Sequence, residues 1–154
     1  MLVPEPRQEE KAVRTKVPVD RINILATIAL FRGCSDRELA EIDSLVDDIE
    51  AEPGEVLTKE GHAGQESFII VDGEAEVTLR GETKALLGPG EFFGEMALLD
   101  PGRPRSATVR AVTPMRLLVI DPRSLSRLMD QPVVARRVLQ GIIQRLRVTE
   151  GAPE

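Results

Sequence analysis

Tryptophan and tyrosine are absent from this 154-residue sequence, and cysteine and histidine each occur once. Aromatic residues form 3% of the chain and hydrophobic residues 42%, so a core must be built mainly from aliphatic side chains. The lone Cys34 cannot form an internal disulfide, which agrees with a reducing cytoplasm and indicates a packing or surface residue. No apolar run reaches the roughly 18 residues of a membrane span, and the N-terminus has no signal-peptide pattern. We therefore expect one cytoplasmic domain that does not enter a membrane.

The single histidine also limits the chemistry that the chain can perform. A metal-dependent enzyme of the cupin type, which has a similar double-sheet architecture, needs several histidines and a glutamate around its metal. His62 lies in a Gly-His-Ala-Gly segment and is predicted to be a surface loop residue. The sequence contains no convincing set of serine or cysteine with histidine and an acid for nucleophilic catalysis. We expect a protein that is not an enzyme and that holds neither a metal nor a cofactor.

The net charge of −6 is unevenly distributed along the chain. Residues 1–100 carry 22 acidic and 10 basic side chains, whereas residues 101–154 carry 4 acidic and 10 basic ones. Because neutralisation of phosphates dominates nucleic-acid affinity, an acidic protein is a poor general binder, and we expect no DNA binding. The arginines of the last predicted helix form either a solvated face beside an oligomer interface, which is the commoner case, or a patch for an acidic partner.

The chain is expected to form one domain with two short extensions. Residues 1–20 are charged, contain three prolines and show no apolar period, so they are predicted to form a flexible N-terminal arm. The domain is expected to span residues 21–150, with a short tail at 151–154. Its pattern is helical at first, and Ser35 with Glu38 predicts a capping box that starts a helix.

Between residues 49 and 121 the pattern changes to short apolar or alternating runs separated by glycine and proline. Asp72 and Gly73 lie between two of these runs and predict a hairpin. Several short strands at this spacing indicate an antiparallel sandwich, barrel or jelly roll. Six strands are predicted: Val56–Lys59, Ser67–Val71, Ala75–Arg80, Lys84–Leu87, Thr108–Thr113 and Met115–Ile120.

The helical pattern returns after the last predicted strand. Asp121 and Pro122 predict the cap and first turn of a short helix, and Pro132 begins a longer one at 133–149. Two apolar faces on this longer helix predict one contact with the domain and one with a partner helix. The first face contains Val134 and Val138, and the second contains Ala135, Leu139, Ile142, Leu146 and Thr149.

The most informative stretch, residues 90–111, reads Gly-Glu-Phe-Phe-Gly-Glu-Met-Ala-Leu-Leu-Asp-Pro-Gly-Arg-Pro-Arg-Ser-Ala-Thr-Val-Arg-Ala. Gly94 permits close approach of a ligand, and the helical turn predicted after it exposes backbone N–H groups that favour an anion. Arg105, at the start of the next strand, supplies a bidentate guanidinium for a phosphate. Glu95 accepts hydrogen bonds from sugar hydroxyls and is also a charge partner for Arg105. The residues alone indicate a small phosphorylated ligand, and the alternative is an ion pair that stabilises a turn.

At this point the sequence resembles the cyclic-nucleotide-binding family, over about residues 25–149. The family's phosphate-binding cassette reads Phe-Gly-Glu-Leu-Ala-Leu, then a short loop, then Pro-Arg-Ala/Ser-Ala-Thr. This chain has Phe-Gly-Glu-Met-Ala-Leu at 93–98 and Pro-Arg-Ser-Ala-Thr at 104–108, at the family's spacing. The resemblance implies a mainly β fold: an antiparallel, eight-stranded β-roll of the jelly-roll type that encloses the nucleotide. N-terminal helices and two C-terminal helices are expected to flank it.

The resemblance also implies which residues bind the nucleotide. Glu95 is similar to the glutamate that binds the ribose 2′-hydroxyl, and Arg105 to the arginine that binds the exocyclic phosphate oxygens. The last helix looks most like that of the catabolite activator branch, in which a threonine reaches the adenine amino group. The predicted ligand-binding residues are Gly94, Glu95, Met96, Ala97, Arg105, Ser106, Ala107 and Thr149.

The expected ligand is cyclic AMP, because the family associates serine at position 106 with cyclic AMP and threonine with cyclic GMP. Cyclic GMP remains possible, since serine also donates a hydrogen bond. The chain ends before the helix-turn-helix domain of the catabolite activator branch, so we expect a stand-alone sensor without a DNA reader. It would act through helix 133–149, as a homodimer or on a partner protein. The alternative is a nucleotide-independent interaction scaffold with the same fold.

Overall fold

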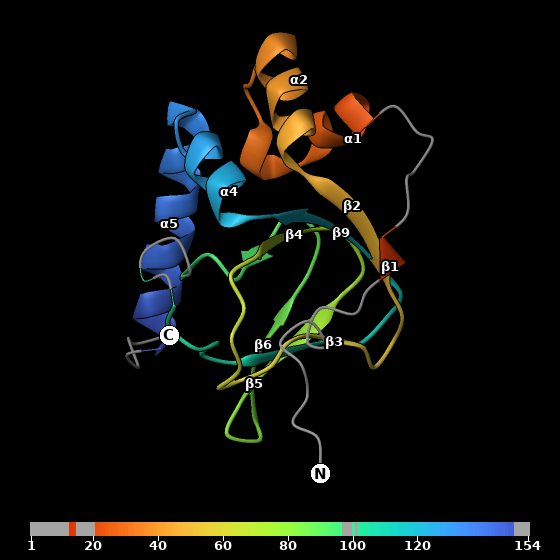
Figure 1. Cartoon of the computed structure of the whole chain (residues 1–154), viewed down its shortest axis with the longest axis vertical. Coiled ribbons are helices and arrows are strands. Elements are labelled where there is room, and N and C mark those ends of the chain that lie inside the picture. The colour runs from red at the N-terminus through yellow and green to blue at the C-terminus, as the bar shows by residue number, and fades with distance from the viewer. Residues whose placement is uncertain (1–12, 15–20, 97–99, 101, 150–154) are drawn as a thin grey trace.

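The computed structural model describes residues 13–14, 21–96, 100 and 102–149, with the backbone alone for 13–14 and 145–149. The rest of the predicted arm and the tail lie outside the described residues. Helices gather at one end of a rolled pair of β-sheets, and the last helix runs down one side of the roll (Figure 1). Within the described ranges, no helix is both long enough and apolar enough to cross a membrane.

The two sheets are antiparallel throughout and confirm the predicted β-roll. The five-stranded sheet has the order β1 (Val13–Arg14), β2 (Asp47–Ala51), β9 (Met115–Ile120), β4 (Ser67–Asp72) and β7 (Phe92–Phe93). The four-stranded sheet has the order β3 (Val56–Thr58), β8 (Thr108–Ala111), β5 (Ala75–Leu79) and β6 (Glu82–Leu87). Strands β2 to β9 are the eight that the family resemblance implies, and all six predicted strands are among them. The two-residue β1 adds an edge strand.

The helices begin where their caps predict. Those before the roll are α1 (Arg21–Thr27), the 3₁₀ helix η2 (Ala29–Phe31) and α2 (Asp36–Leu45). Those after it are α4 (Pro122–Leu128) and α5 (Pro132–Thr149). The capping box of α2 is complete, since Ser35 Oγ accepts from Glu38 N at 3.1 Å and Glu38 Oε1 accepts from Ser35 N at 2.7 Å. Asp121 caps α4 by accepting from Ser124 N at 2.7 Å.

The buried side chains form two clusters on opposite faces of the five-stranded sheet. In β9, Leu118 and Ile120 pack under the helices, whereas Leu117 and Val119 point into the roll. Strand β4 alternates in the same way. Because successive side chains of a strand point to opposite faces, the unbroken apolar runs of β4 and β9 reflect a sheet covered on both sides.

The predicted hairpin at Asp72 and Gly73 is wrong. Strand β4 before it belongs to the five-stranded sheet and β5 after it to the four-stranded sheet, so the turn passes between sheets. The local Asp-Gly signal selects a tight turn but cannot specify which strands pair afterwards. The hairpin lies one strand later, where Arg80 and Gly81, with φ of 52° and 81°, join β5 to β6. Two consecutive positive φ values fit the twist of paired strands.

Strand β2 escapes prediction because its sequence, Asp-Asp-Ile-Glu-Ala, is rich in acid. The side chain of Asp48 is 1% exposed and accepts two hydrogen bonds from Arg116 of β9, from Nη2 at 2.8 Å and Nε at 3.1 Å. The hydrogen bond to Asp48 raises the pKa of Arg116. A bidentate guanidinium makes a buried carboxylate tolerable, and that partner lies 68 residues away.

Candidate functional site

The candidate site begins where β7 ends. Strand β7 pairs with β4, with Phe93 opposite Phe68, and leads directly into Gly94 and Glu95. Gly94 has a φ of 82°, and a Cβ placed there would lie 2.7 Å from the carbonyl oxygen of Glu66. The same Cβ would lie 3.2 Å from Nη1 of Arg105. Only glycine therefore fits between β4 and the arginine.

Arg105 reaches this point from the loop before β8 and is 7% exposed. Its backbone N–H donates to the carbonyl of His62 at 2.8 Å, and its carbonyl accepts from the N–H of Gly61 at 2.8 Å. Its guanidinium carbon lies 6.0 Å from the ring centroid of Phe68, a cation–π arrangement. The two hydrogen bonds hold the backbone of Arg105, and its guanidinium lies over the Phe68 ring.

Two stacked aromatic rings, of Phe68 and Phe93, lie next to Arg105. Phe68 stacks on Phe93, with ring centroids 4.7 Å apart and an interplanar angle of 13°. Ser67 Oγ donates to the carbonyl of Gly94 at 3.1 Å, which ties β4 to the backbone that follows β7. Sequence patterns do not identify Phe68 or Ser67 as site residues, because nothing local in β4 distinguishes them from core positions.

Glu95 is 6% exposed, so the glutamate and the arginine of the cassette are both buried. Fully buried charged residues are rare in proteins unless they are paired or functional. The described backbone continues to Met96, whose carbonyl accepts from the N–H of Asp100 at 3.0 Å. Residues 97–99, where the sequence predicts a helical turn, lie outside the described residues.

The predicted ligand-binding residues fall into three groups. Gly94, Glu95 and Arg105 come together, and Met96 follows them half-buried. Ser106 is exposed, while Ala107 is half-buried and its carbonyl accepts from Thr58 Oγ1 at 3.0 Å. Ala97 lies outside the described residues, and the described backbone of α5 ends at Thr149. The roles of all eight in binding remain predictions.

Two other reactive side chains lie away from this site. Cys34 is half-buried against the helical core cluster, and burial, with a smaller contribution from Glu38, raises the pKa of its thiol. A thiol of raised pKa is a weak nucleophile at neutral pH. His62 is half-buried in the loop whose backbone holds Arg105. In the part of the chain that the structure describes, no three His, Cys, Asp or Glu side chains gather as a metal site.

Comparison with known proteins agrees with this geometry. The family model described as the cyclic nucleotide-binding domain matches residues 48–132. A CRP-like cAMP-activated global transcriptional regulator of Mycobacterium tuberculosis is 27% identical over 132 residues, 82% of this chain and 58% of that protein. A putative potassium channel protein of Rhodopseudomonas palustris is 36% identical over 122 residues, 77% of this chain and 29% of that protein.

Among solved structures, one titled "cAMP bound PfPKA-R (141-441)" superposes with a TM-score of 0.75 at 25% identity. The match covers 84% of this chain and 45% of that one. This chain thus spans less than two thirds of the length of these relatives, which have different outputs. The shared part is the roll and its flanking helices.

Proposed function

Since the chain belongs to the cyclic nucleotide-binding domain family, we propose that its 154 residues by themselves bind cyclic AMP and act as a regulatory sensor, not as an enzyme. The observation that carries this proposal is the buried guanidinium of Arg105 beside Gly94, one residue from the buried Glu95. In a ligand with an anion and a sugar, a guanidinium binds the anion, and a carboxylate accepts hydrogen bonds from the sugar hydroxyls.

The phosphate is assigned to Arg105. Its backbone is held by residues 61–62 and its guanidinium lies over Phe68, so the side chain is largely buried before a ligand binds and loses little freedom on binding. The N–H groups that follow Gly94 supply further donors at the start of the helical turn. Glu95 is assigned to the ribose hydroxyls, which donate to a carboxylate.

We expect the chain to bind cyclic AMP more tightly than cyclic GMP, because residue 106 is a serine. Thr149, at the end of α5, is the candidate contact for the base. About 22 heavy atoms at roughly 0.3 kcal/mol each give about 7 kcal/mol, which corresponds to tens of micromolar. Preorganisation of Arg105 favours tighter binding than this. The binding of cyclic GMP is the second outcome that the same measurement can give.

The output is assigned to α5 because that helix touches the strand that enters the site. A Cβ on Gly141 would lie 2.7 Å from Cζ of Phe92, so α5 packs directly on the Phe92 ring. Phe92 precedes Phe93, whose ring stacks on the Phe68 that supports Arg105. A shift of the cassette on ligand binding would therefore move the surface on which α5 rests. Such a shift requires the ligand to bind one arrangement of α5 better than another.

The test is calorimetric titration of the purified chain, freed of copurified ligand, with cyclic AMP and cyclic GMP. We expect Arg105→Ala to weaken binding tenfold to a hundredfold or more, because charge-assisted hydrogen bonds contribute about 1.5–3 kcal/mol each. Arg103→Ala is the matched control, since Arg103 is exposed in the same loop, and it should bind like the wild type. If folded protein binds neither nucleotide, the sensor proposal is wrong and the interaction scaffold becomes the better hypothesis.

A further inference from the structure

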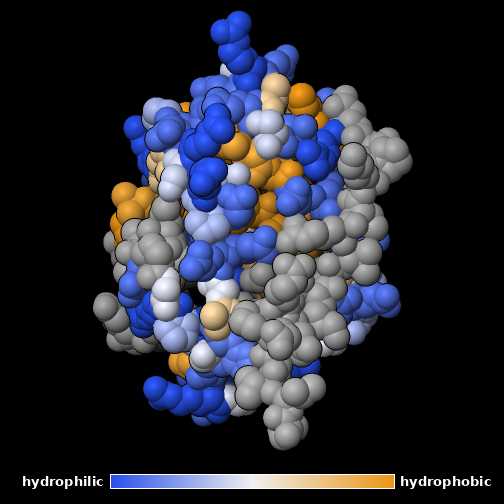
Figure 2. Space-filling view, in the orientation of Figure 1, coloured by the Kyte–Doolittle hydropathy of each residue, from blue (hydrophilic) through white to orange (hydrophobic). Residues whose placement is uncertain are grey.

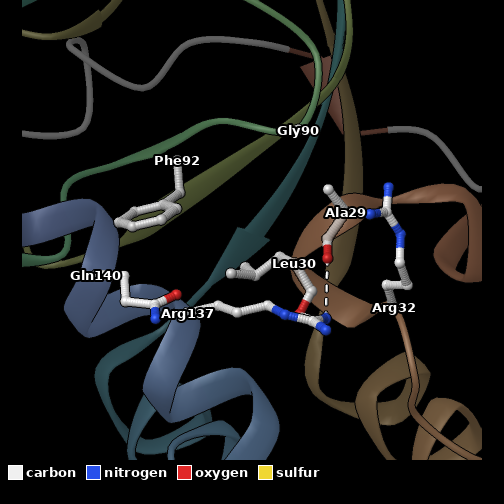
Figure 3. A pocket seen from close by; sticks show the side chains of 7 residues that line it. All are labelled: Ala29, Leu30, Arg32, Gly90, Phe92, Arg137 and Gln140. Carbon is white, nitrogen blue, oxygen red and sulfur yellow. Dashed lines mark hydrogen bonds between the residues drawn. The ribbon is translucent and has the colours of Figure 1, made fainter. Parts of the chain in front are cut away.

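A second concave site lies away from the cassette, between η2, α5 and the turn that joins β6 to β7. It is a pocket of about 320 Å³. Figure 3 shows Arg137 and Gln140 extending from α5 and the ring of Phe92 close to Gln140. Ala29, Leu30 and Arg32 lie at η2 and at the residue that follows it. Its volume is at the lower end of the range for small-ligand sites.

Arg137 is half-buried in this pocket, and only some of the N–H donors of its guanidinium have partners in the structure. Its Nη1 donates to the carbonyl of Ala29 at 2.9 Å and to that of Leu30 at 3.1 Å, which holds α5 against η2. A guanidinium carries five N–H donors. These two bonds leave Nε and Nη2, the edge that binds a carboxylate or phosphate with two parallel hydrogen bonds.

Two arginines and no acidic residue line the pocket, although the protein as a whole is acidic. Arg32 is the second arginine of the lining, and no carboxylate of the described residues forms an ion pair with Arg32 or Arg137. Two carboxylates of neighbouring segments have backbone partners: Glu38 accepts from Ser35 N, and Glu91 accepts from Gly88 N. An anion in the pocket would be attracted by both positive charges.

The rest of the lining is suited to a flat or apolar body. The ring of Phe92 faces the pocket, Ala29 and Leu30 add aliphatic surface, and the amide of Gln140 offers a donor and an acceptor. We propose that this pocket binds a small ligand that carries a carboxylate or phosphate on a compact aromatic or apolar body, with the anion on Arg137 and Arg32. The site is separate from the proposed nucleotide site, so either proposal can fail without the other.

A ligand bound here touches α5 and η2 at once, and it also contacts Phe92 just before the cassette. It would therefore stabilise the arrangement in which α5 lies against η2. That arrangement is already held by the two hydrogen bonds of Arg137, so the ligand would strengthen an existing contact between elements more than 100 residues apart.

The test is a titration of the full isotope-labelled chain with phenyl phosphate at constant ionic strength, followed by amide NMR shifts. We expect saturable shifts at Gly33, Gly90 and Gln140, and binding about tenfold weaker in Arg137→Gln. Arg136→Gln removes the same charge from an exposed neighbouring residue of α5 and should bind like the wild type. Arg32→Gln should also weaken binding; since Arg32 is exposed, this variant tests the site even if Arg137→Gln does not fold.

Further titrations define what the pocket recognises. Inorganic phosphate should give the same shifts but bind more weakly, because it lacks the body that contacts Phe92. A glutamate-containing peptide distinguishes an acidic side chain of a partner protein from a small molecule as the source of the anion. The proposal is overturned if no saturable shift occurs up to about 10 mM phenyl phosphate, or if Arg137→Gln and Arg32→Gln both bind like the wild type. Shifts confined to residues 94–105 would place the anion at the nucleotide site and also overturn it.

Discussion

Gly73 and Gly81 have nearly the same backbone conformation, with φ of 92° and 81°, but very different surroundings. A Cβ on Gly81 would meet nothing within 4 Å, because the hairpin between β5 and β6 is open. A Cβ on Gly73 would lie 2.3 Å from the carbonyl oxygen of Pro114 and 2.9 Å from Cα of Met115. Backbone atoms cannot move aside as the end of a side chain can, so the turn between the two sheets has no room for a side chain at Gly73.

We therefore predict that Gly73→Ala destabilises the fold far more than Gly81→Ala. An alanine at a positive φ lowers the free energy of unfolding by about 1–2 kcal/mol, and this loss is common to both variants. Gly73→Ala should lose roughly 1–3 kcal/mol more through overpacking against Pro114 and Met115. Urea unfolding of the two variants measures the difference in free energy of unfolding. Equal losses would show that the approach of Gly73 to β9 relaxes without cost.

At the scale of elements, α5 shows how a helix keeps an unfavourable residue for a packing reason. Glycine inside a helix is about 1 kcal/mol less favourable than alanine, and it weakens the prediction of this helix from sequence. The structure gives the reason for Gly141, because the Phe92 ring occupies the space of its missing side chain. The helix is as long as its apolar pattern predicts, but its contact with β7 depends on this position.

We predict that Gly141→Ala lowers the free energy of unfolding by up to about 2 kcal/mol, although alanine is the better helix former. Overpacking against Phe92 is expected to cost roughly 1–3 kcal/mol and to exceed the gain of about 1 kcal/mol in helix propensity. Phe92→Leu should make Gly141→Ala neutral or stabilising, since the smaller side chain leaves room for the methyl group. A double-mutant cycle from urea unfolding measures this coupling, and strictly additive effects would contradict the packing explanation.

Of the two apolar faces predicted for α5, the structure shows the inner one, whereas the side chains of Leu146 and Thr149 on the outer one lie outside those described. Val134 and Val138 are buried in the helical core cluster, as expected. Ile142, predicted for the outer face, packs partly against the same cluster, whereas Ile143 is 42% exposed. The outer face thus centres on Leu139, which is 57% exposed. In Figure 2, apolar side chains show at several places between polar ones on the face in view.

At the scale of the whole molecule, we predict that two copies associate through this outer face of α5. Leu139→Glu should weaken self-association about tenfold or more, because it places an unpaired carboxylate in an apolar contact. It should leave the stability of the single chain nearly unchanged. Leu86→Glu is the matched control, since Leu86 is 60% exposed on the edge strand β6. Sedimentation equilibrium measures the self-association of both variants. If Leu139→Glu associates like the wild type, the copies do not meet through this face of α5.

The sequence by itself determined the features that depend on neighbours a few residues apart. Caps at Ser35 and Asp121 start two helices, and alternation and apolar runs locate six strands. The cassette motif singles out Glu95 and Arg105, which the structure buries. These signals act through local hydrogen bonds and side-chain periodicity, which a chain carries before it folds.

Only the tertiary structure decided which distant segments meet. It assigned β4 and β5 to different sheets and made β2 a strand by pairing Asp48 with Arg116. It also placed Arg105 over Phe68, and Arg137 on the carbonyls of η2. Partners in these contacts are separated by between 37 and 108 residues, so no local pattern encodes them. These contacts form only when the roll closes. One sheet is then buried on both faces, and each charged group near it must find a hydrogen-bond partner among the segments that have come together.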